Sequence, residues 1–497
     1  MTAGSSSTHT LSPSSGEIHS IKRRAAQGIA TLVVRYGLVI CINLAGTIVL
    51  SRRIGPSLWG AFAISQSAYL IGQEICGRGL ASYLIKKDAP PAPDDIRATF
   101  ALQNLLGLVA MGFILTAARP LAGWYGQGQL YLLLTAAALA CYGYALRGVP
   151  VALLERSFEY FKVSVLEILE TTLFYAAAIP LVWMGQVEAG LASAIVLRSW
   201  GPTLLTFLLK PVRPAFWPNW TGMGKIVDFG FSVAGSNLIN IGIYSVPAVF
   251  VGKLSGMAEL GRAQMAFSLY SNLLFMTAAV VRLNLSAYAR LIEHAGEFAT
   301  AINQHLQILA AVLVPLIVIF AGFSPAWSSF IFGQKWQGLS GLLLAQAPGY
   351  LLASVFWGVL NPALLVSGKH RQVLIWLAGF FVLYAVLTRL LSPALGAMGV
   401  AVAFTSAEIL FHPLLFWVYG FKRLNCRRIF PEIIMSAVFA GLIWICAQRS
   451  LLAGLLCGTL YLIVWCARNW KTLDSASRDF SPHLRGSALN WVVPADR

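Results

Sequence analysis

The stretch "LVVRYGLVICINLAGTIVLSRRIG" (residues 32–55) is apolar over most of its length, yet it contains Arg35. An α-helix rises 1.5 Å per residue, so about 20 apolar residues are enough to cross the ~30 Å hydrocarbon core of a bilayer. This stretch is therefore predicted to be the first membrane-spanning helix. The role of the permanent cation inside it depends on what the other helices contain.

The composition of the whole chain supports a membrane location. Of the 497 residues, 58% are hydrophobic and 11% are charged, and the mean hydropathy is +0.71. Soluble globular proteins carry about 25% charged residues. Apolar runs of roughly 20 residues recur along the chain, whereas the ~10-residue alternating segments of a membrane β-barrel are absent. The sequence therefore predicts an all-α polytopic membrane protein.

The charge and the cysteines exclude several other classes. The net charge of +17 does not favour a nucleic-acid partner, because the basic residues form short clusters between hydrophobic helices. The seven cysteines are scattered and show no CxxC pair or metal-ligand spacing, so we expect neither a metal nor a cofactor. The first twenty residues are rich in Ser and Thr and lack Lys and Arg, which predicts a disordered tail rather than a signal peptide.

Hydropathy, turn signals and charge breaks predict fourteen spans. They are 29–50, 58–76, 98–117, 129–149, 163–184, 189–209, 226–250, 262–282, 302–322, 339–360, 372–391, 396–419, 432–448 and 451–467. With the N-terminus in the cytoplasm, the cytoplasmic loops and tails hold 26 Lys and Arg residues and the opposite loops hold 8. The positive-inside rule therefore places both termini in the cytoplasm.

A repeat divides the spans into two lobes. The segment "IVLSRRIGPSLWGAFAISQSAY" (48–69) recurs as "VFVGKLSGMAELGRAQMAFSLY" (249–270), which aligns Gly60 with Gly261. Parallel repeats imply two lobes related by an axis along the membrane normal, with the pathway between them. The expected organisation is a disordered cytoplasmic tail (1–24), an N-lobe (25–210), a cytoplasmic linker (211–225), a C-lobe (226–420), an extra helix pair (421–468) and a cytoplasmic tail (469–497).

Arg198 is the most deeply placed charge. It lies eleven residues from Leu209, the end of its span, and is therefore ~16 Å deep. Glu170 lies at ~11 Å on the neighbouring antiparallel span. The two side chains can form a desolvated ion pair that holds the spans together. Alternatively, Arg198 faces a central cavity beside Glu167, Glu170 and Thr171, because charges inside a membrane are often functional.

Polar residues also recur on single helix faces. These stripes are interhelical contacts or the lining of a polar path, and the sequence leaves both interpretations open. The residues concerned are Asn237, Asn240 and Tyr244; Ser268, Ser271, Asn272 and Arg282; Gln346 with Tyr350; and Glu408 with His412.

Two interpretations of Arg35 follow. At ~9 Å depth it can extend to the cytoplasmic interface. Alternatively, Arg35 and Arg282 form a cationic mouth that recruits an anionic headgroup, since the guanidinium fork suits phosphate. Glu167, Glu170 and Glu408 are candidates for proton or sodium coupling, or for ion pairing. No catalytic residue is expected, because nucleotide-binding, hydrolase-triad and metalloenzyme motifs are absent from the sequence.

Six stretches, in order, resemble the polysaccharide transporter (Wzx-type) flippases of the multidrug/oligosaccharidyl-lipid/polysaccharide exporter superfamily. The most specific, "SPAWSSFIFGQKWQGLSGLLLAQAPGYLLAS", resembles the loop with the phenylalanine-glycine-x-lysine-tryptophan motif of that family. The stretches are 50–65, 77–87, 150–168, 324–354, 361–374 and 396–404. The resemblance covers about residues 25–420, and Arg198 is not a position shared with the family.

The resemblance implies a bacterial inner-membrane flippase for undecaprenyl-pyrophosphate-linked oligosaccharide units. Its implied partners are this lipid-linked oligosaccharide and membrane lipid, with contacts to a polysaccharide polymerase and export machinery also to be considered. The expected substrate path comprises Arg35, Arg198, Arg282, Asn237, Asn240, Tyr244 and Asn272. Two alternatives stay open. A drug exporter of the same superfamily would favour acidic cavity residues, and a polysaccharide polymerase or ligase would be expected to carry a large periplasmic loop.

Overall fold

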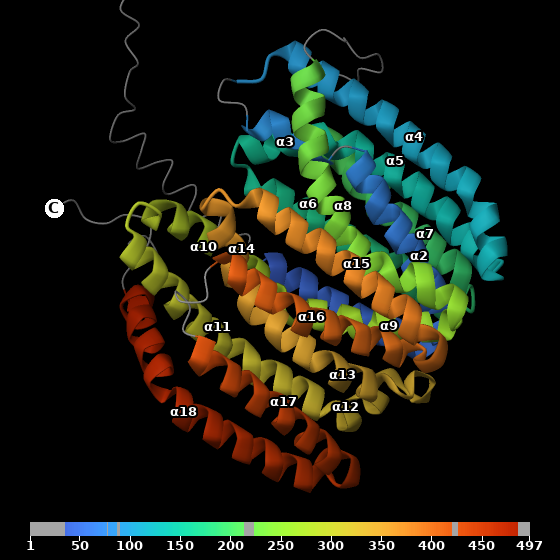
Figure 1. Ribbon diagram of the computed structural model, residues 1–497. Coiled ribbons are helices and arrows are strands. Elements are labelled where there is room, and N and C mark those ends of the chain that lie inside the picture. Colours follow the sequence, from blue (N-terminus) through green and yellow to red (C-terminus); the bar gives the residue numbers. More distant parts are fainter. Residues whose placement is uncertain (1–34, 77, 87–89, 213–222, 420–425, 486–497) are drawn as a thin grey trace, which may run out of the picture.

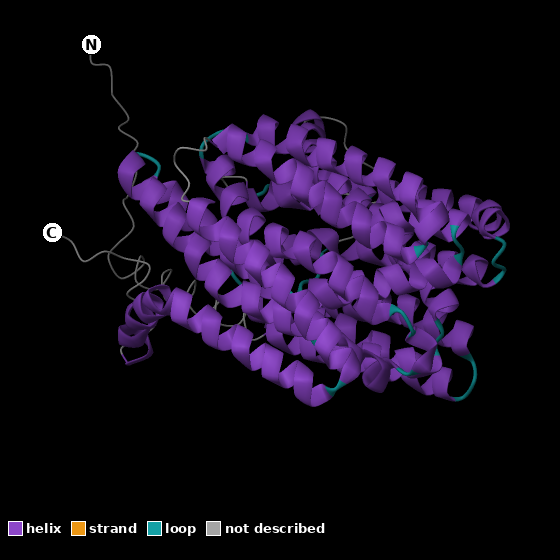
Figure 2. Cartoon of the chain, turned by 60° about the horizontal axis from the view of Figure 1, so that its bottom comes forward, coloured by secondary structure: helices purple, strands orange, loops and turns teal. Residues whose placement is uncertain are grey.

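The structure is a computed structural model in which five ranges are described. They are residues 35–76, 78–86, 90–212, 223–419 and 426–485. Within these ranges the chain is helical and contains no strand, which confirms the all-α prediction (Figures 1 and 2). The predicted N-terminal tail (1–24), most of the linker (213–222) and the end of the C-terminal tail (486–497) lie outside the described residues.

The helices are labelled in Figure 1, apart from the first helix, 35–53. In the N-terminal half they are α2 Pro56–Ile75, α3 Arg78–Lys86, α4 Pro93–Tyr125, α5 Gln129–Arg156, α6 Tyr160–Trp183 and α7 Val187–Leu209. In the C-terminal half they are α8 Met223–Leu254, α9 Met257–Leu273, α10 Phe275–Leu291, α11 Ala295–Gly322, α12 Ser324–Phe332, α13 Leu339–Leu352, α14 Gly358–Val366, α15 His370–Leu395 and α16 Ala397–Tyr419. The last pair is α17 Cys426–Arg449 and α18 Leu451–Arg485.

The described part of each of the fourteen predicted spans is helical, apart from single end residues and the interruptions given below. Ten helical segments of the described ranges are long and apolar enough to cross a membrane, so the protein is a multi-pass membrane protein. The short helices α3 and α12 were not predicted. The helix of predicted span fourteen does not end near residue 467 but continues to Arg485.

Two predicted spans are interrupted. The span predicted at 262–282 is broken at Leu274, which separates α9 from α10. The span predicted at 339–360 contains a π-helical turn, Ala353–Trp357, between α13 and α14. Irregular backbone at membrane depth is tolerated where it is buried in protein or lines a cavity. These two breaks are therefore of functional interest.

Local chemistry explains several helix ends. Pro56 and Pro93 occupy the first turns of α2 and α4, where a missing N–H costs no helical hydrogen bond. Gly126 ends α4 with φ +67°, a left-handed conformation that glycine adopts without strain. Long helices therefore alternate with short loops at the two ends of the bundle (Figure 2).

The two halves repeat the same packing. In the N-terminal half α5 packs against α4 and α7; in the C-terminal half α13 packs against α11 and α16. The pair α6 and α7 likewise corresponds to the pair α15 and α16. The halves meet where α2 packs against α8 and α9. Helices α17 and α18 pack on α11, along one side of the C-terminal half (Figure 1).

At the end where the first helix stops, the two halves are joined by a set of hydrogen bonds. We call segments 51–53 and 330–336 the clasp. The Arg52 guanidinium donates to the carbonyls of Phe330 and Ile331, at 3.0 and 2.9 Å. Segment 330–336 also donates to segment 51–53: the Trp336 indole N–H donates to the Ser51 carbonyl at 2.9 Å, and the Lys335 ammonium donates to the Arg53 carbonyl at 3.2 Å. The most specific stretch of the family resemblance, residues 324–354, thus connects the two halves.

Candidate functional site

The N-terminal half encloses a cavity of about 480 Å³. Its wall comes from the first helix and from α2, α3, α4, α5, α6 and α7. Five of its lining residues carry charged side chains. They are Arg147, Glu155, Glu167, Glu170 and Arg198.

Glu170 is the centre of the charged cluster. One carboxylate oxygen accepts a hydrogen bond from Arg147 Nη2 at 2.5 Å, and the other accepts one from Arg198 Nη2 at 3.1 Å. The pair of Arg198 and Glu170 considered in the sequence is therefore present. Two guanidinium groups share one carboxylate, so the three side chains together retain one positive charge. Burial strengthens such contacts and makes an unpaired charge costly.

Aromatic rings and an amide complete the surroundings of Arg198. Its guanidinium carbon lies 5.4 Å from the ring centroid of Tyr69 and 5.5 Å from that of Phe174. Its Nη1 donates to the Gln66 side-chain oxygen at 3.2 Å. The buried Nε–H of Arg198 has no acceptor among the described residues. A donor in this state, on the wall of a cavity, is suited to an anionic or hydroxylic ligand.

Arg35 lies beside the same cavity. Its guanidinium is 2.7 Å from the Glu167 carboxylate and 4.2 Å from the Tyr36 ring centroid. Arg35 is only 4% exposed, and its partner Glu167 on α6 holds the side chain in place. Its extension to the membrane interface stays a prediction. Glu167, whose side chain is 46% exposed, faces the cavity.

Sequence reasoning missed Arg147. The predicted span stopped at residue 149, which placed Arg147 at the membrane edge. In the structure α5 continues through Pro150 to Arg156, and Arg147 is buried. A proline within a membrane helix is tolerated where neighbouring groups compensate for the missing hydrogen bond. The signal that could have revealed this pair is the position of Arg147 and Glu170 on two consecutive helices, α5 and α6.

A second cavity, of about 570 Å³, lies in the C-terminal half. Its wall contains Asn240 and Tyr244 of α8, and Glu408 and His412 of α16. His412 Nδ1 lies 3.1 Å from the Glu408 carboxylate and 2.8 Å from the Glu408 carbonyl oxygen. The i,i+4 pair read from the sequence is therefore formed within the cavity wall.

The remaining candidate residues have different positions. Asn237 donates to the Glu74 carboxylate of α2 at 3.1 Å and so connects the two halves. Asn272 lies near the end of α9, and no cavity described above includes it. The Arg282 side chain is outside the described part of the structure, so the predicted mouth of Arg35 and Arg282 stays a prediction. No group of three His, Cys, Asp or Glu side chains in the described ranges is placed to hold a metal ion.

Comparison with known proteins shows what this arrangement resembles. Teichuronic acid biosynthesis protein TuaB of Bacillus subtilis (strain 168) is 22% identical over 322 residues. The alignment covers 63% of this chain and 65% of that protein, so the chain spans slightly less than two thirds of the relative's length.

Among solved structures, the fold is similar to that of a lipid II flippase MurJ in an inward closed conformation. The TM-score is 0.72 at 12% identity, covering 89% of this chain and 99% of the other. It is also similar to a multidrug resistance MATE family transporter of the MOP superfamily in an inward-facing conformation. There the TM-score is 0.54 at 16% identity, covering 80% and 98% of the two chains. At these identities the likeness concerns the fold alone.

The family of the chain follows from its sequence match. The family described as "Polysaccharide biosynthesis protein" matches residues 49–340, more than half of the chain. This region includes the clasp and both arginines of the Glu170 cluster. It also confirms the resemblance recognised in the sequence, together with the shared fold. The chain therefore belongs to the polysaccharide biosynthesis protein family.

Proposed function

We propose that the protein is a flippase that moves undecaprenyl-pyrophosphate-linked oligosaccharide units from the cytoplasmic to the periplasmic leaflet of the bacterial inner membrane. The units would serve exopolysaccharide, O-antigen or capsule synthesis. The proposal rests on the family match, the flippase and transporter folds, and the charged cavity of the N-terminal half.

The cluster around Glu170 is the observation that carries the proposal. A pyrophosphate cannot cross hydrocarbon unaided, because an unpaired charge there is expensive. It requires a recess with cationic donors, and release requires that these donors do not bind it too tightly. In the cluster, Glu170 already occupies the two guanidinium groups of Arg147 and Arg198. An incoming phosphate would compete with this carboxylate, which weakens its net binding.

Alternating access explains the clasp. The clasp joins the two halves at one end, and the charged cavity lies nearer the opposite end, where α5 ends and α6 begins. In the proposed orientation, with both termini cytoplasmic, the clasp lies on the periplasmic side. The described state then admits substrate from the cytoplasm, and rocking of the halves opens the clasp and releases substrate to the periplasm.

This proposal involves no covalent chemistry. The substrate enters and leaves unchanged, the lipid tail stays in the bilayer, and Glu167 or Glu408 would couple the cycle to an ion. Contacts with a polymerase and with export machinery would follow release. A drug exporter of the same superfamily has the same fold, and the cavity arginines are the feature that disfavours cationic drugs.

The test uses cells that lack this protein but retain the enzymes of glycan assembly. Lipid-linked oligosaccharides are extracted and quantified, and their leaflet is determined by lectin access to intact spheroplasts. We expect complete units to accumulate and to be inaccessible from outside. Wild-type protein should release them, and Arg198→Ala should not. Units that reach the outer leaflet normally and stay unpolymerised would overturn the proposal in favour of a polymerase.

A further inference from the structure

We propose that the cavity of the C-terminal half is a carbohydrate-binding subsite, which holds uncharged sugar residues of the glycan while the N-terminal cavity holds the charged linkage. This inference rests on the proposed function and assigns a separate role to the second cavity. It commits to a neutral, hydroxyl-rich ligand.

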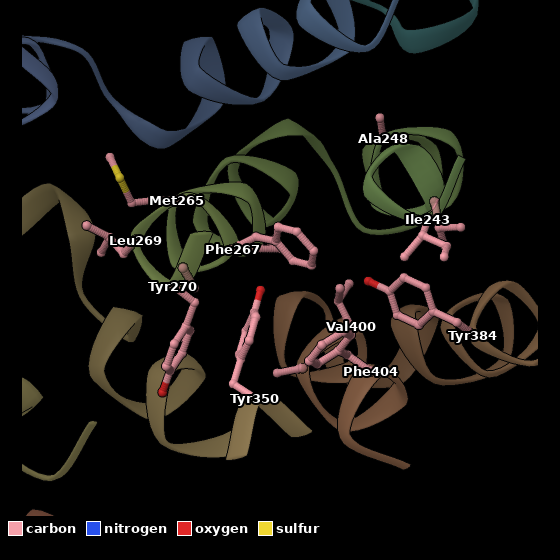
Figure 3. Packing of buried hydrophobic residues seen from close by; sticks show 14 of the residues in the cluster. Ile243, Ala248, Met265, Phe267, Leu269, Tyr270, Tyr350, Tyr384, Val400 and Phe404 are labelled. Carbon is pink, nitrogen blue, oxygen red and sulfur yellow. The ribbon is translucent and has the colours of Figure 1, made fainter. Parts of the chain in front are cut away.

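Aromatic rings form the wall of this cavity. Trp376 stacks with Trp357 and with Phe380, and the ring centroids lie 4.8 and 5.8 Å from that of Trp376. The Trp376 indole N–H donates to the Phe411 carbonyl at 2.9 Å, which fixes the orientation of the stack. Figure 3 shows the rings of Phe267, Tyr350 and Phe404 converging from α9, α13 and α16. Fixed aromatic faces suit the C–H faces of a pyranose ring, which are apolar.

Tyr244 contributes a ring that is less constrained. It is 47% exposed, and its ring centroid lies 5.0 Å from that of Phe267 in an edge-on arrangement. A large aromatic side chain exposed within a cavity has no core to complete, so its truncation should leave the fold intact. It is therefore the side chain best placed to meet a ligand.

The two interruptions of the helices lie in the same wall. Leu274, where α9 ends, lines the cavity, and so do Ala353, Ser354 and Trp357 of the π-helical turn. Such π-helical turns occur frequently at functional sites, and broken membrane helices are typical of substrate sites in transporters. Two independent interruptions at one cavity therefore point to a ligand.

Two hydroxyl groups in the wall have no hydrogen-bond partner among the described residues. Tyr350 is 6% exposed, and its hydroxyl makes no hydrogen bond with any described residue; the buried hydroxyl of Thr277 is in the same state. Buried hydroxyl groups are normally satisfied, and leaving one unsatisfied is costly. Sugar hydroxyls, which both donate and accept, would satisfy them.

The charge of this cavity differs from that of the first. Among its described lining residues, Glu408 is the only Asp, Glu, Lys or Arg, and the His412 imidazole lies beside it. Such a site offers little attraction to a pyrophosphate. A mostly apolar pocket with a few polar groups that fix orientation is typical of small-molecule recognition.

The experiment measures binding of released glycan to the full-length protein in lipid nanodiscs. The probe is the water-soluble oligosaccharide released by mild acid from the lipid-linked pool of cells lacking the protein. Saturation-transfer difference NMR reports which ligand protons touch the protein. We expect signals from pyranose ring C–H protons. We also expect Tyr244→Ala to weaken the apparent affinity about tenfold, as for loss of one aromatic contact.

Tyr131→Ala is the matched control, because Tyr131 is also an exposed tyrosine and lines neither cavity. It should bind like wild type. A second probe, tetraphenylphosphonium, tests the rival ligand class, since an aromatic box with a carboxylate also suits an organic cation. Binding of this cation without binding of glycan would overturn the proposal. So would the absence of binding of either probe, or glycan binding that Tyr244→Ala leaves unchanged.

The proposed function can fail separately. If glycan binds at Tyr244 but lipid-linked units reach the outer leaflet of cells lacking the protein, the subsite stands and the flippase role is wrong. If the units stay inside those cells but the released glycan does not bind, the flippase role stands and the subsite is wrong.

Discussion

Gly60 and Gly261, which align in the two sequence repeats, pack directly against each other. A Cβ atom on Gly261 would lie 1.8 Å from the Pro56 carbonyl oxygen, and one on Gly60 would lie 2.3 Å from the Met257 carbonyl oxygen. Pro56 and Met257 are the first residues of α2 and α9 and also align in the repeats. Contacts between equivalent residues are what a two-fold axis through this point requires. The equivalent ends of α2 and α9 thus meet close to clasp segment 51–53, which α2 follows in the chain.

We predict that Gly60→Ala and Gly261→Ala weaken closure at the clasp. Each added methyl group would meet backbone, which cannot move aside without separating α2 from α9. Overpacking of this kind typically costs about 1–3 kcal/mol. The assay introduces Arg53→Cys and Gln334→Cys into a background without other cysteines. A short bismaleimide should cross-link these two cysteines less efficiently when Gly60→Ala or Gly261→Ala is also present. Gly112→Ala is the control, because nothing lies within 4 Å of its Cβ position. Cross-linking equal to wild type would contradict the assignment.

Trp336→Phe should also favour the unclasped state. The indole N–H that reaches the Ser51 carbonyl is lost, and a buried acceptor without its donor costs about 1–3 kcal/mol. Trp327→Phe is a matched control, since its indole donates to the Phe320 carbonyl within the same half. The cross-linking assay should therefore separate the two variants, whereas thermal stability should fall in both. Equal cross-linking in both variants would show that the bond of Trp336 does not hold the halves together.

In the Glu170 cluster, two substitutions should reduce the stability of the protein by unequal amounts. Glu170→Gln leaves two buried guanidinium groups without a counter-charge, and removing one partner of a buried ion pair costs about 3–5 kcal/mol. Arg198→Gln should cost less, because Arg147 still pairs with Glu170. Thermal unfolding in detergent gives the order. A Glu170→Gln protein as stable as wild type would mean that the cluster is not the electrostatic centre of the cavity.

The pair of Arg35 and Glu167 can be tested by exchange. Arg35→Glu and Glu167→Arg should each reduce stability and transport, because each brings like charges together where opposite charges now lie 2.7 Å apart. The double exchange should recover much of both, since the contact is restored with its polarity reversed. A double-mutant cycle measures this coupling. If the double variant is as impaired as the sum of the single variants, the contact has no energetic role.

The spans were predictable because a membrane helix is almost a local property. Its length and apolarity are set by the bilayer, and the described part of each predicted span is helical apart from single end residues and the break at Leu274. The partners of the polar residues are a property of the packing. The sequence suggested that Arg198 meets Glu170, because the two lie at similar depth on adjacent spans. It did not show that Arg147 shares that carboxylate, or that Glu167 holds the Arg35 side chain in place.

The interruptions were not predictable for the same reason. Neither "SLYSNLLFM" (268–276) nor "LLASVFWGV" (351–359) contains proline, and the polar residues of the first stretch fit a single face of a regular helix. Leu274 and Ala353–Trp357 leave regular helical geometry where they line a cavity formed by helices distant in sequence. Local propensity does not contain that information.

The central claim is that this chain alone moves a lipid-linked glycan across a bilayer. The most direct measurement reconstitutes purified protein into sealed vesicles that contain the extracted lipid-linked oligosaccharide in both leaflets. A membrane-impermeant glycosidase then acts from outside, with and without imposed proton or sodium gradients. We expect glycan of the inner leaflet to become accessible with wild-type protein and to stay protected with Arg198→Ala. Protection in wild-type vesicles equal to that in protein-free vesicles, under every gradient, would contradict it.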